Sequence, residues 1–534
     1  MTGDLFAGTG WLLRLNLRLD RIQIPAWTLG FLVLVWASVI AMQDAYPDNA
    51  SLQARALLLS NPAAIMMTGP LFDAENYTLG AAIANELMLY VMVPAAVMSV
   101  LIMTRHTRAD EQAGRTEMLR ALPVGRFAPP TAAMITVTIA NLLAGAAVAA
   151  GLAIPGGAVA DSVAAGVGTA MAGMVFAAFT AVAAQVSDNA ATVRGMGLGA
   201  IAAAYMVRGF GDVINHSGSW LSWFSPFAWA QQMRAYVDLR WWPMLLAVAA
   251  TLVLTALSAA LAHRRDLGAG LRATRPGPAA APRRLLSPAG LAWHRTSGMF
   301  LGWGVGLGAM AVGMGSLANS LQDMIDQNPA FQDWVEFDMS AITQSFGALI
   351  LSFLALGPAA LIVAGILRLR EEETSTRTEI TLVSGSSRAG YLLGWSAVVT
   401  LLSLVLLVIF GATTGLGMTL ATGEAEWIGE LTLASLAYVP AVLVFGGLAL
   451  ALYGLAPRRA PLAWAVVVWA SIVSMLGELF KLPDWARGLS PLWHTPLMPG
   501  PEPEPWTLAL LTALAVALAV LGVLGFRRRD AGQA

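Results

Sequence analysis

The sequence predicts an all-α polytopic membrane protein with twelve transmembrane helices, arranged as two fused six-helix repeats. Of its 534 residues, 57% are hydrophobic and 12% are charged, whereas soluble domains average about 25% charged residues. Apolar runs of about 20 residues recur along the chain, and each is long enough to span a hydrocarbon core of roughly 30 Å. A short charged pattern also occurs twice, which indicates an internal repeat.

Twelve stretches are long enough and apolar enough to cross a bilayer. The first follows Arg14, Arg18 and Arg21 and is longer than the apolar core of a cleaved signal peptide, so we expect it to be retained as a span. In the first half, the predicted spans lie near residues 25–43, 81–104, 128–153, 161–186, 192–211 and 243–262. In the second half, they lie near residues 298–317, 341–367, 391–419, 428–455, 461–480 and 506–526.

The distribution of arginine sets the orientation of these spans. When the N-terminus is placed in the cytoplasm, 25 of the 30 arginines fall on the cytoplasmic side, as the positive-inside rule requires. The exceptions are Arg55, Arg208, Arg234, Arg240 and Arg487. A single lysine and abundant arginine, alanine and glycine are typical of a high-GC bacterial genome. We therefore expect a multi-pass protein of the bacterial plasma membrane with both termini in the cytoplasm.

The charged pattern lies between the second and third spans of each half. Arg108-Ala-Asp-Glu, Arg115-Thr-Glu and Arg126 are followed 262 residues later by Arg370-Glu-Glu-Glu, Arg377-Thr-Glu and Arg388. Arg-Arg-Asp at 264–266 returns at 528–530, and Ser-Pro-Phe at 225–227 returns as Ser-Pro-Leu at 490–492. We therefore predict a first six-span repeat in residues 1–263 and a second in residues 289–534, joined by a cytoplasmic linker at 264–288. Because six is even, both halves share one orientation.

The first copy of the pattern predicts a short amphipathic helix on the cytoplasmic membrane surface, at about residues 108–124. Met118, Leu119 and Leu122 recur at helical spacing, and Pro123 with Gly125 ends the helix. The second copy predicts a similar helix at about residues 370–386. The alternative is a solvated loop that satisfies the positive-inside rule, but orientation does not require carboxylates at fixed positions. Paired charges of both signs suit docking into a protein groove.

The first copy resembles the cytoplasmic signature of type-2 ABC transporter permeases in Glu111, Gly114, Thr116-Glu117, Leu119, Pro123 and Arg126. The whole chain is similar to the actinobacterial permeases classed as exporters of polyketide antibiotics, the tetronasin-resistance type. This resemblance implies that the two surface helices are coupling helices for an ATP-binding subunit, and that segments at about 8–22 and 289–299 are elbow helices. The implied coupling residues are Asp110, Glu111, Arg115, Thr116, Glu117, Arg120, Glu372, Glu373, Arg377, Thr378 and Glu379. The second copy departs from the signature at Ser384, so the two contacts need not be equivalent.

The sequence lacks a motif for binding ATP. A P-loop requires G-x-x-x-x-G-K-[ST], and the only lysine, Lys481, is followed by leucine. If the chain is an ABC subunit, ATP and Mg²⁺ must be bound by another polypeptide, and two coupling helices imply two copies of it, expected to form a homodimer. The chain itself is expected to be no enzyme and to hold no cofactor. It has no cysteine and no histidines at metal-ligand spacing, so we expect no metal site, and we expect no nucleic-acid partner.

Polar residues within the spans are candidates for a transport path, because burying them in lipid is costly. The candidates are Asn85 and Glu86 in the second span, Arg208 and Asp212 in the fifth, Glu478 beside Lys481 in the eleventh, and Met92. The alternative for the charged pairs is that they lie at helix ends and face water. Met92 belongs to a set of methionines that suit an adaptable apolar cavity, or equally contact with lipid. The resemblance implies hydrophobic drugs or antibiotics as substrates.

Two other classes of function fit this pattern less well. A proton-coupled secondary transporter of the major facilitator type also has twelve spans in two halves, but its hallmark loop G-x-x-x-D-R-x-G-R does not fit Asp110 followed by Glu111. A membrane-embedded enzyme acting on lipid would need clustered carboxylates or histidines near one membrane surface. The acidic residues from Asp323 to Asp338 form a dense cluster, but they lack a nucleophile–base arrangement.

Overall fold

The computed structural model describes residues 5–60, 62–215, 217–265, 268–271, 280–316, 318, 339–476, 482–500 and 504–530. The secondary structure within these ranges is helical, and no strand occurs in them. The chain divides into two compact units, unit 1 (Met1–Gly277) and unit 2 (Pro278–Ala534). Each unit has a large hydrophobic core of its own.

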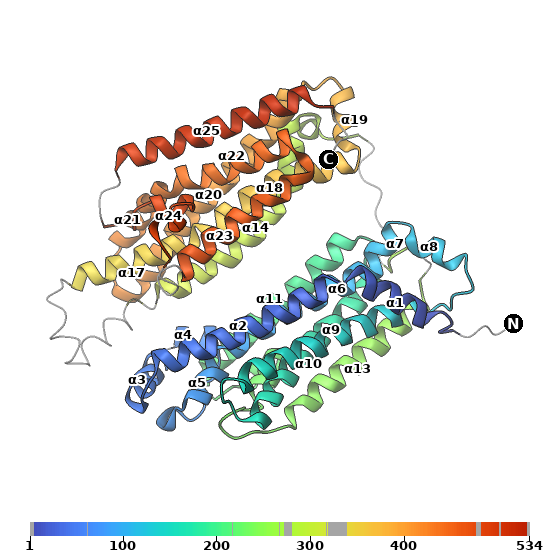
Figure 1. Ribbon diagram of the computed structural model, residues 1–534, viewed down its shortest axis with the longest axis vertical. Helices are drawn as coiled ribbons and strands as arrows, with labels where there is room; N and C mark the ends of the chain where they lie inside the picture. Colours follow the sequence, from blue (N-terminus) through green and yellow to red (C-terminus); the bar gives the residue numbers. More distant parts are fainter. Residues whose placement is uncertain are drawn as a thin grey trace. The chain divides into compact units, whose positions relative to one another are not determined.

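Unit 1 is a bundle of long helices with several short ones at its ends (Figure 1). In chain order its α-helices are α1 (Thr9–Leu19), α2 (Gln23–Ala45), α3 (Asn49–Leu59), α4 (Pro62–Thr68), α5 (Leu79–Glu86), α6 (Met88–Thr104), α7 (Asp110–Gln112), α8 (Arg115–Arg120), α9 (Ala128–Ala153), α10 (Val159–Val186), α11 (Ala190–Ile214), α12 (Pro226–Gln231) and α13 (Pro243–Ala262). A π-helical turn at Arg105–Ala109 joins α6 to α7, and 3₁₀ helices lie at Ala74–Asn76 and Ser222–Phe224.

Small residues bring α6, α9 and α10 together at the centre of unit 1. A Cβ atom on Gly145 or Gly166 would lie 2.6 or 2.3 Å from the carbonyl oxygen of the other glycine, so the backbones of α9 and α10 are in direct contact. Gly173 of α10 lies against the side chain of Asn141 in α9, and the Asn141 amide donates to Ser99 of α6 over 2.8 Å. Such small-residue contacts are the usual means by which helices pack in membranes.

Unit 2 is also a bundle of long helices (Figure 1). Its α-helices are α14 (Pro288–Gly315), α17 (Met339–Leu354), α18 (Leu356–Thr374), α19 (Arg377–Val383), α20 (Arg388–Thr422), α21 (Glu426–Ser435), α22 (Val439–Leu455), α23 (Ala463–Leu476), α24 (Asp484–Arg487) and α25 (Pro505–Arg528). Four 3₁₀ helices lie at Arg283–Leu286, Leu436–Tyr438, Pro457–Leu462 and Pro491–His494.

Helices at corresponding places in the two units pack in the same way. In unit 1, α10 packs against α6 and α13, and α9 packs against α2. In unit 2, α22 packs against α18 and α25, and α20 packs against α14. These pairs hold the same positions in the order of the predicted spans. The origin of the two units as a six-span repeat stays a prediction.

Eleven helical stretches of the described chain are long enough and apolar enough to cross a membrane. They are Gln23–Ala45, Leu79–Gln112, Ala128–Ala153, Val159–Val186, Ala190–Ile214, Pro243–Ala262, Pro288–Gly315, Thr343–Thr374, Arg388–Thr422, Glu426–Leu455 and Pro505–Arg528. The remaining predicted span, near 461–480, contains α23, which has 14 residues, and the residues after it lie outside the described part. The prediction of an all-α polytopic membrane protein is confirmed, and the count of twelve stays a prediction.

The outward side chains of the spans are apolar, as expected for a protein solvated by lipid. Along α13, the exposed fractions of Leu245, Leu252 and Val253 are 69%, 64% and 64%. A soluble protein rarely leaves so continuous an apolar surface uncovered.

The two predicted elbow helices have different outcomes. A separate helix, α1, covers most of residues 8–22. Residues 289–299 form no separate helix, because they are the first turns of α14, which begins at Pro288 and continues to Gly315. The Thr296 hydroxyl donates to the carbonyl oxygen of Ala292 within this helix. No turn interrupts α14 in the way that the turn at residues 20–22 separates α1 from α2.

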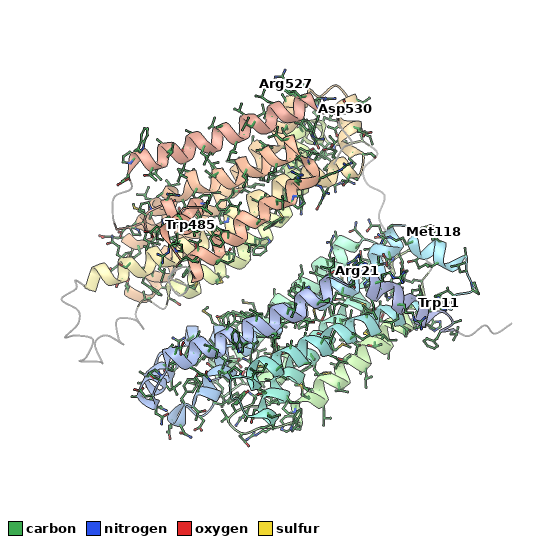
Figure 2. All side chains as sticks on the ribbon, viewed as in Figure 1. Trp11, Arg21, Met118, Trp485, Arg527 and Asp530 are labelled. Carbon is green, nitrogen blue, oxygen red and sulfur yellow. The ribbon has the colours of Figure 1, made fainter. Side chains whose placement is uncertain are left out.

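The ends of each bundle carry different segments. Figure 2 shows Trp11, Arg21 and Met118 at one end of unit 1, which we call the α8 end. Helices α3, α4 and α5 lie at its other end, the α5 end (Figure 1). In unit 2, Arg527 and Asp530 lie at the end that carries α19, and Trp485 lies toward the opposite end (Figures 1 and 2).

Candidate functional site

The predicted surface helix of unit 1 is divided into two parts. The π-helical turn at Arg105–Ala109 and α7 prolong α6 as far as Gln112, and the separate helix α8 covers only Arg115–Arg120. Gly114 separates the two parts with a φ of 72°, a left-handed conformation that glycine adopts without a Cβ penalty. The helix predicted at 108–124 is therefore shorter than expected, because its first residues belong to the end of the second span.

The second copy is divided at the corresponding position. Helix α18 continues to Thr374, and α19 covers Arg377–Val383 rather than the predicted 370–386. Thr376 separates them with a φ of 60°. A left-handed backbone is unusual for threonine and costs of order 1–3 kcal/mol. Both units therefore place a sharp break between the end of a span and a short surface helix.

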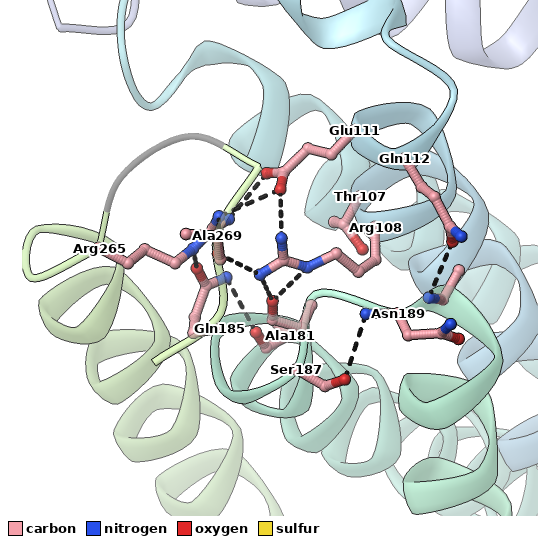
Figure 3. Close-up of polar contacts among 12 residues, drawn as sticks. Thr107, Arg108, Glu111, Gln112, Ala181, Gln185, Ser187, Asn189, Arg265 and Ala269 are labelled. Atoms are coloured by element: carbon pink, nitrogen blue, oxygen red, sulfur yellow. Dashed lines mark hydrogen bonds and ion pairs between the residues drawn. The ribbon is translucent and has the colours of Figure 1, made fainter. Parts of the chain in front are cut away.

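Glu111, at the end of the prolonged second span, binds two arginines in a largely buried cluster (Figure 3). Its carboxylate accepts from Arg108 over 2.7 Å and from Arg265 over 2.7 Å. The side chains of Arg108 and Arg265 are 1% and 10% exposed. Arg265 follows α13, so this ion pair fastens the end of the second span to the end of the sixth. Charge-assisted hydrogen bonds of this kind are stronger than neutral ones.

The same arginines fix the end of α10 (Figure 3). Arg108 donates from Nε to the Ala184 carbonyl oxygen over 2.8 Å, and Arg265 donates to the Gln185 side chain over 2.5 Å. Cationic side chains at a helix C-terminus satisfy its last carbonyl groups and interact favourably with its dipole. The cluster therefore joins the ends of the second, fourth and sixth spans.

Unit 2 contains the corresponding ion pair. The Glu373 carboxylate accepts from both terminal nitrogens of Arg529, over 2.5 and 2.7 Å, and from the Tyr453 hydroxyl over 2.8 Å. Arg529 follows α25, the last span, and Tyr453 lies on α22. Burial lowers the pKa of Arg529, but the hydrogen bond and charge of Glu373 outweigh it and raise the pKa above the usual value. We call the pairs Glu111–Arg265 and Glu373–Arg529 the span clamps.

A second pair of contacts ties each surface helix to the span before it. Arg115, the first residue of α8, lies 3.0 Å from the Asp110 carboxylate. Arg377, the first residue of α19, donates to both carboxylate oxygens of Glu372, over 2.7 and 3.0 Å, and this hydrogen bonding raises the pKa of Arg377.

The next residue of the pattern points inward in both helices. Thr116 and Thr378 are 6% and 0% exposed. The Thr378 hydroxyl lies 3.1 Å from the Tyr391 hydroxyl at the start of α20. Both threonines therefore lie on the side of their short helix that packs against the bundle.

The outer face of each surface helix combines one acid with apolar side chains. Glu117 and Glu379 are exposed, and among the described side chains their carboxylates have no partner. Beside them, Met118 and Ile380 are 67% and 69% exposed, and Leu122 and Val383 are 58% and 88% exposed. The side chain of Arg120 lies outside the described part of the structure.

The structure therefore separates the eleven predicted coupling residues into distinct roles. Asp110, Glu111, Glu372 and Glu373 bind arginines of the same unit. Glu117 and Glu379 face outward. Sequence reasoning missed Arg108, Arg265 and Arg529 as members of the site, although the Arg-Arg-Asp stretch repeated after the last span of each half was a signal that could have found two of them.

The predicted path residues Asn85 and Arg208 both hold the end of α4 and the residues that follow it, at the α5 end of unit 1. Asn85 donates to the carbonyl oxygens of Gly69 and Pro70 over 3.2 and 2.9 Å. Arg208 donates to the carbonyl oxygen of Met66. Gln231, which the sequence did not single out, donates to Thr68 over 2.7 Å. The segment at 66–70, which is the end of α4 and the two residues after it, is thus held by three different helices.

The remaining path residues are also in structural contacts. Arg208 and Asp212 are both 0% exposed and 3.2 Å apart, so the interpretation that this pair faces water is wrong. Glu86 binds Arg55 over 2.6 Å. Met92 is 0% exposed within the core of unit 1 and does not face lipid. Glu478 and Lys481 lie outside the described residues.

Comparison with known proteins identifies the family of the chain. The family model described as "Multidrug efflux system permease Rv1217c, C-terminal domain" matches residues 12–264 and 285–527, one stretch in each unit. The chain is 38% identical to the multidrug efflux system permease protein Rv1217c of Mycobacterium tuberculosis (strain ATCC 25618 / H37Rv). The alignment spans 536 residues and covers 99% of this chain and 96% of that protein. The match of the family model across both units and the 38% identity over the length of the chain place this chain in the family of multidrug efflux system permeases that includes Rv1217c.

Proposed function

We propose that the chain is the membrane-spanning subunit of an ATP-driven ABC exporter that expels hydrophobic drugs or antibiotics. ATP and Mg²⁺ are bound by two copies of a separate ATP-binding subunit, because the sequence has no P-loop. Membership in a multidrug efflux permease family supports the efflux of drugs. The proposal puts α8, α19 and both termini on the cytoplasmic side of a bacterial plasma membrane, in agreement with the distribution of arginine.

The observation that carries this proposal is the exposed face shared by α8 and α19. Each presents an acid, Glu117 or Glu379, beside an apolar residue, Met118 or Ile380. An amphipathic helix that inserts into a groove is a common mode of protein recognition, in which apolar side chains anchor the helix. A single charge at the edge of such a contact sets the register and excludes wrong partners.

The span clamps connect the segments around α8 and α19 to the spans, so a force applied to these two helices would reach the spans. A subunit that pulls on α19 pulls on Glu372 through Arg377, and on α25 through the neighbouring Glu373 and Arg529. In unit 1 the corresponding route runs from α8 through Asp110 and Glu111 to α13. Movement of an outside ATPase would thus reach the spans directly, without a flexible connection.

Reversing the charge on the docking faces tests the proposal. We expect Glu117→Arg with Glu379→Arg to insert normally but to reduce ATP-dependent drug export into inside-out vesicles about tenfold, the equivalent of about 1.4 kcal/mol in binding. An ATP-binding subunit that co-purifies with the wild-type chain should also no longer co-purify with this variant. The control is Glu75→Arg, an exposed acid in the 3₁₀ helix at the α5 end, which should change neither.

Two outcomes would contradict the proposal. One is unchanged export and co-purification in the double variant. The other is export by the wild-type chain that follows an imposed proton gradient and ignores ATP, because that behaviour belongs to a secondary transporter.

A further inference from the structure

A groove with a volume of about 700 Å³ lies at the α8 end of unit 1. One wall is α1, from Trp11 to Arg18, and the other is the end of α8 with the residues after it, from Leu119 to Val124. Figure 2 shows Trp11 and Met118 at this same end of the unit. The volume lies within the range of about 300–1,000 Å³ that is usual for small-molecule sites. Glu117 and Met118, which carry the docking proposal, do not line the groove.

Both walls of the groove are fixed by contacts at its base. The buried Leu12 of α1 packs against α9, and Leu119 and Val124 from the other wall pack against the same small cluster. The chain before α1 is also joined to the chain after α8, because the Gly125 amide donates to the Ala7 carbonyl oxygen over 2.9 Å. The two walls therefore belong to one packed structure, and the groove between them is a fixed feature of unit 1.

One face of α1, with the turn after it, exposes apolar side chains at helical spacing. Trp11 and Ile22 are 78% and 74% exposed, and Leu15 and Leu19 between them are also exposed. A row of this kind is unfavourable in contact with water. Because the first span, α2, begins at Gln23, the row lies where the chain enters the membrane. A helix with an apolar face beside basic residues is typical of the membrane interface.

A row of exposed arginines lies beside this apolar face. Arg14 and Arg18 line the groove, and Arg21 continues the row at helical spacing. In the described part of unit 1, the arginines that form ion pairs with carboxylates are Arg55, Arg105, Arg108, Arg115, Arg208, Arg240 and Arg265. The row is not among them, and the described residues that line the groove include no acid.

The neighbouring acid Asp20 does not compensate this charge. Its side chain is 0% exposed and binds Arg105, at the end of the second span, over 2.6 Å. One turn earlier, the Asn16 amide donates to the Thr136 hydroxyl of α9 over 3.4 Å. This face of α1 therefore points into the bundle, and the charge of the arginines stays on the side of the groove.

The positive-inside rule accounts for positive charge at this end of the chain, but it does not require an apolar groove beside that charge. The corresponding segment of unit 2, residues 289–299, contains one arginine, Arg295. Its Nε lies 3.2 Å from the Glu372 carboxylate, so that charge is used within the unit. The combination of unpaired arginines with an apolar wall therefore distinguishes α1 from this segment.

We propose that the groove binds an anionic phospholipid from the leaflet around the α8 end, with its phosphate on Arg14 and Arg18 and an acyl chain along Trp11 and Leu122. Arginine pairs with phosphate through charge-assisted hydrogen bonds, and anionic lipids attract basic segments at the membrane surface. The apolar walls favour a lipid over a soluble phosphate, because only the lipid supplies a chain that covers them. The site does not depend on an ATP-binding partner.

Binding of labelled lipids to the purified full-length protein tests the proposal. In a neutral maltoside detergent, phosphatidylglycerol with a fluorescent label on one acyl chain should bind at least about tenfold more tightly than the matching phosphatidylcholine, as measured by fluorescence anisotropy. Arg14→Gln with Arg18→Gln should reduce that preference to less than about twofold. The matched control is Arg194→Gln with Arg264→Gln, because these exposed arginines lie on α11 and just after α13, outside the groove. This control should keep the full preference.

A second variant removes part of the apolar wall without changing any charge. Trp11→Ala should weaken binding of phosphatidylglycerol about tenfold, since less apolar surface is then available to the acyl chain. Because Trp11 is largely exposed, this change leaves the packing of unit 1 intact. The control is Trp220→Ala, which removes an equally exposed tryptophan at the α5 end and should keep the affinity within about twofold.

Several outcomes would overturn the proposal. They are equal binding of the two lipids by the wild-type protein, an unchanged preference in the double arginine variant, or full affinity in Trp11→Ala. Displacement of the labelled lipid by glycerol 3-phosphate as effectively as by phosphatidylglycerol would identify a soluble phosphate as the occupant instead. Protection of Leu122→Cys from thiol labelling by a co-purified ATP-binding subunit, together with no lipid preference, would assign the groove to a protein partner. Because the lipid measurements contain no ATP-binding subunit, their failure is distinguishable from failure of the docking proposal.

Discussion

Two carboxylates, the partly exposed Glu111 and the buried Glu373, hold the candidate site together. Glu373 is 1% exposed, and a carboxylate in that position is tolerated only when it is paired and hydrogen-bonded. Arg529 and Tyr453 supply three hydrogen bonds to it. A buried ion pair adds little net stability compared with an apolar replacement, but removing one partner leaves a buried charge and is strongly destabilising.

Removing the carboxylate of unit 2 should therefore destabilise the protein. We expect Glu373→Ala to lower the free energy of unfolding by about 3–5 kcal/mol, because Arg529 then lacks its counter-ion. Thermal unfolding of the purified protein in detergent measures the effect.

The neighbouring exposed acid gives the control for this change. Glu379→Ala should alter the stability by at most about 0.5 kcal/mol, as is usual for a surface position. The double variant Glu373→Arg with Arg529→Glu should recover part of the loss. Equal stability of Glu373→Ala and Glu379→Ala would show that the clamp of unit 2 contributes nothing.

At the scale of elements, the break before each surface helix decides where its exposed face points. Gly114 and Thr376 both adopt left-handed backbone, and each is followed by an arginine bound to the end of the preceding span. Because of the break, the axes of α8 and α19 need not continue the axes of the preceding spans. Without it, α7 and α8 would tend to form one continuous helix.

Replacing Gly114 with alanine tests the importance of this break. A Cβ atom at Gly114 meets no atom within 4 Å, so the cost comes from the backbone alone, about 1–2 kcal/mol for a left-handed residue with a side chain. The control is Gly195→Ala in α11, where a Cβ also meets no atom within 4 Å and φ is helical, and which should stabilise by about 0.5–1 kcal/mol. Thermal unfolding compares them, and a shift of the same sign in both variants would contradict the account.

The sequence was sufficient to predict the spans but not the contacts between their ends. Runs of apolar residues locate a membrane helix by length alone, so the first span predicted at 25–43 appears as Gln23–Ala45. The break at Thr376 could not be predicted, because threonine has no preference for left-handed backbone. The clamps were missed because their partners are 154 and 156 residues apart, and helix periodicity says nothing about contacts over that separation.

At the scale of the whole chain, the two units share the same end contacts but differ in detail. Both carry a clamp, an arginine at the start of the surface helix and a buried threonine after it. Unit 1 alone ends its surface segment with Pro123. We therefore expect two docking faces of the same kind and of unequal strength.

Cysteine cross-linking tests the central claim, that α8 and α19 are the docking faces for an outside ATPase. The chain has no cysteine, so Met118→Cys, Ile380→Cys and, as a control at the α5 end, Trp220→Cys each introduce a single reactive site, and Trp220 is 72% exposed. The variants are treated with a short amine–thiol cross-linker in membranes of the native host. We predict a cross-linked ATP-binding subunit for Met118→Cys and Ile380→Cys and none for Trp220→Cys. Absence of cross-linked ATPase at both surface helices, or equal cross-linking at Trp220→Cys, would contradict the account.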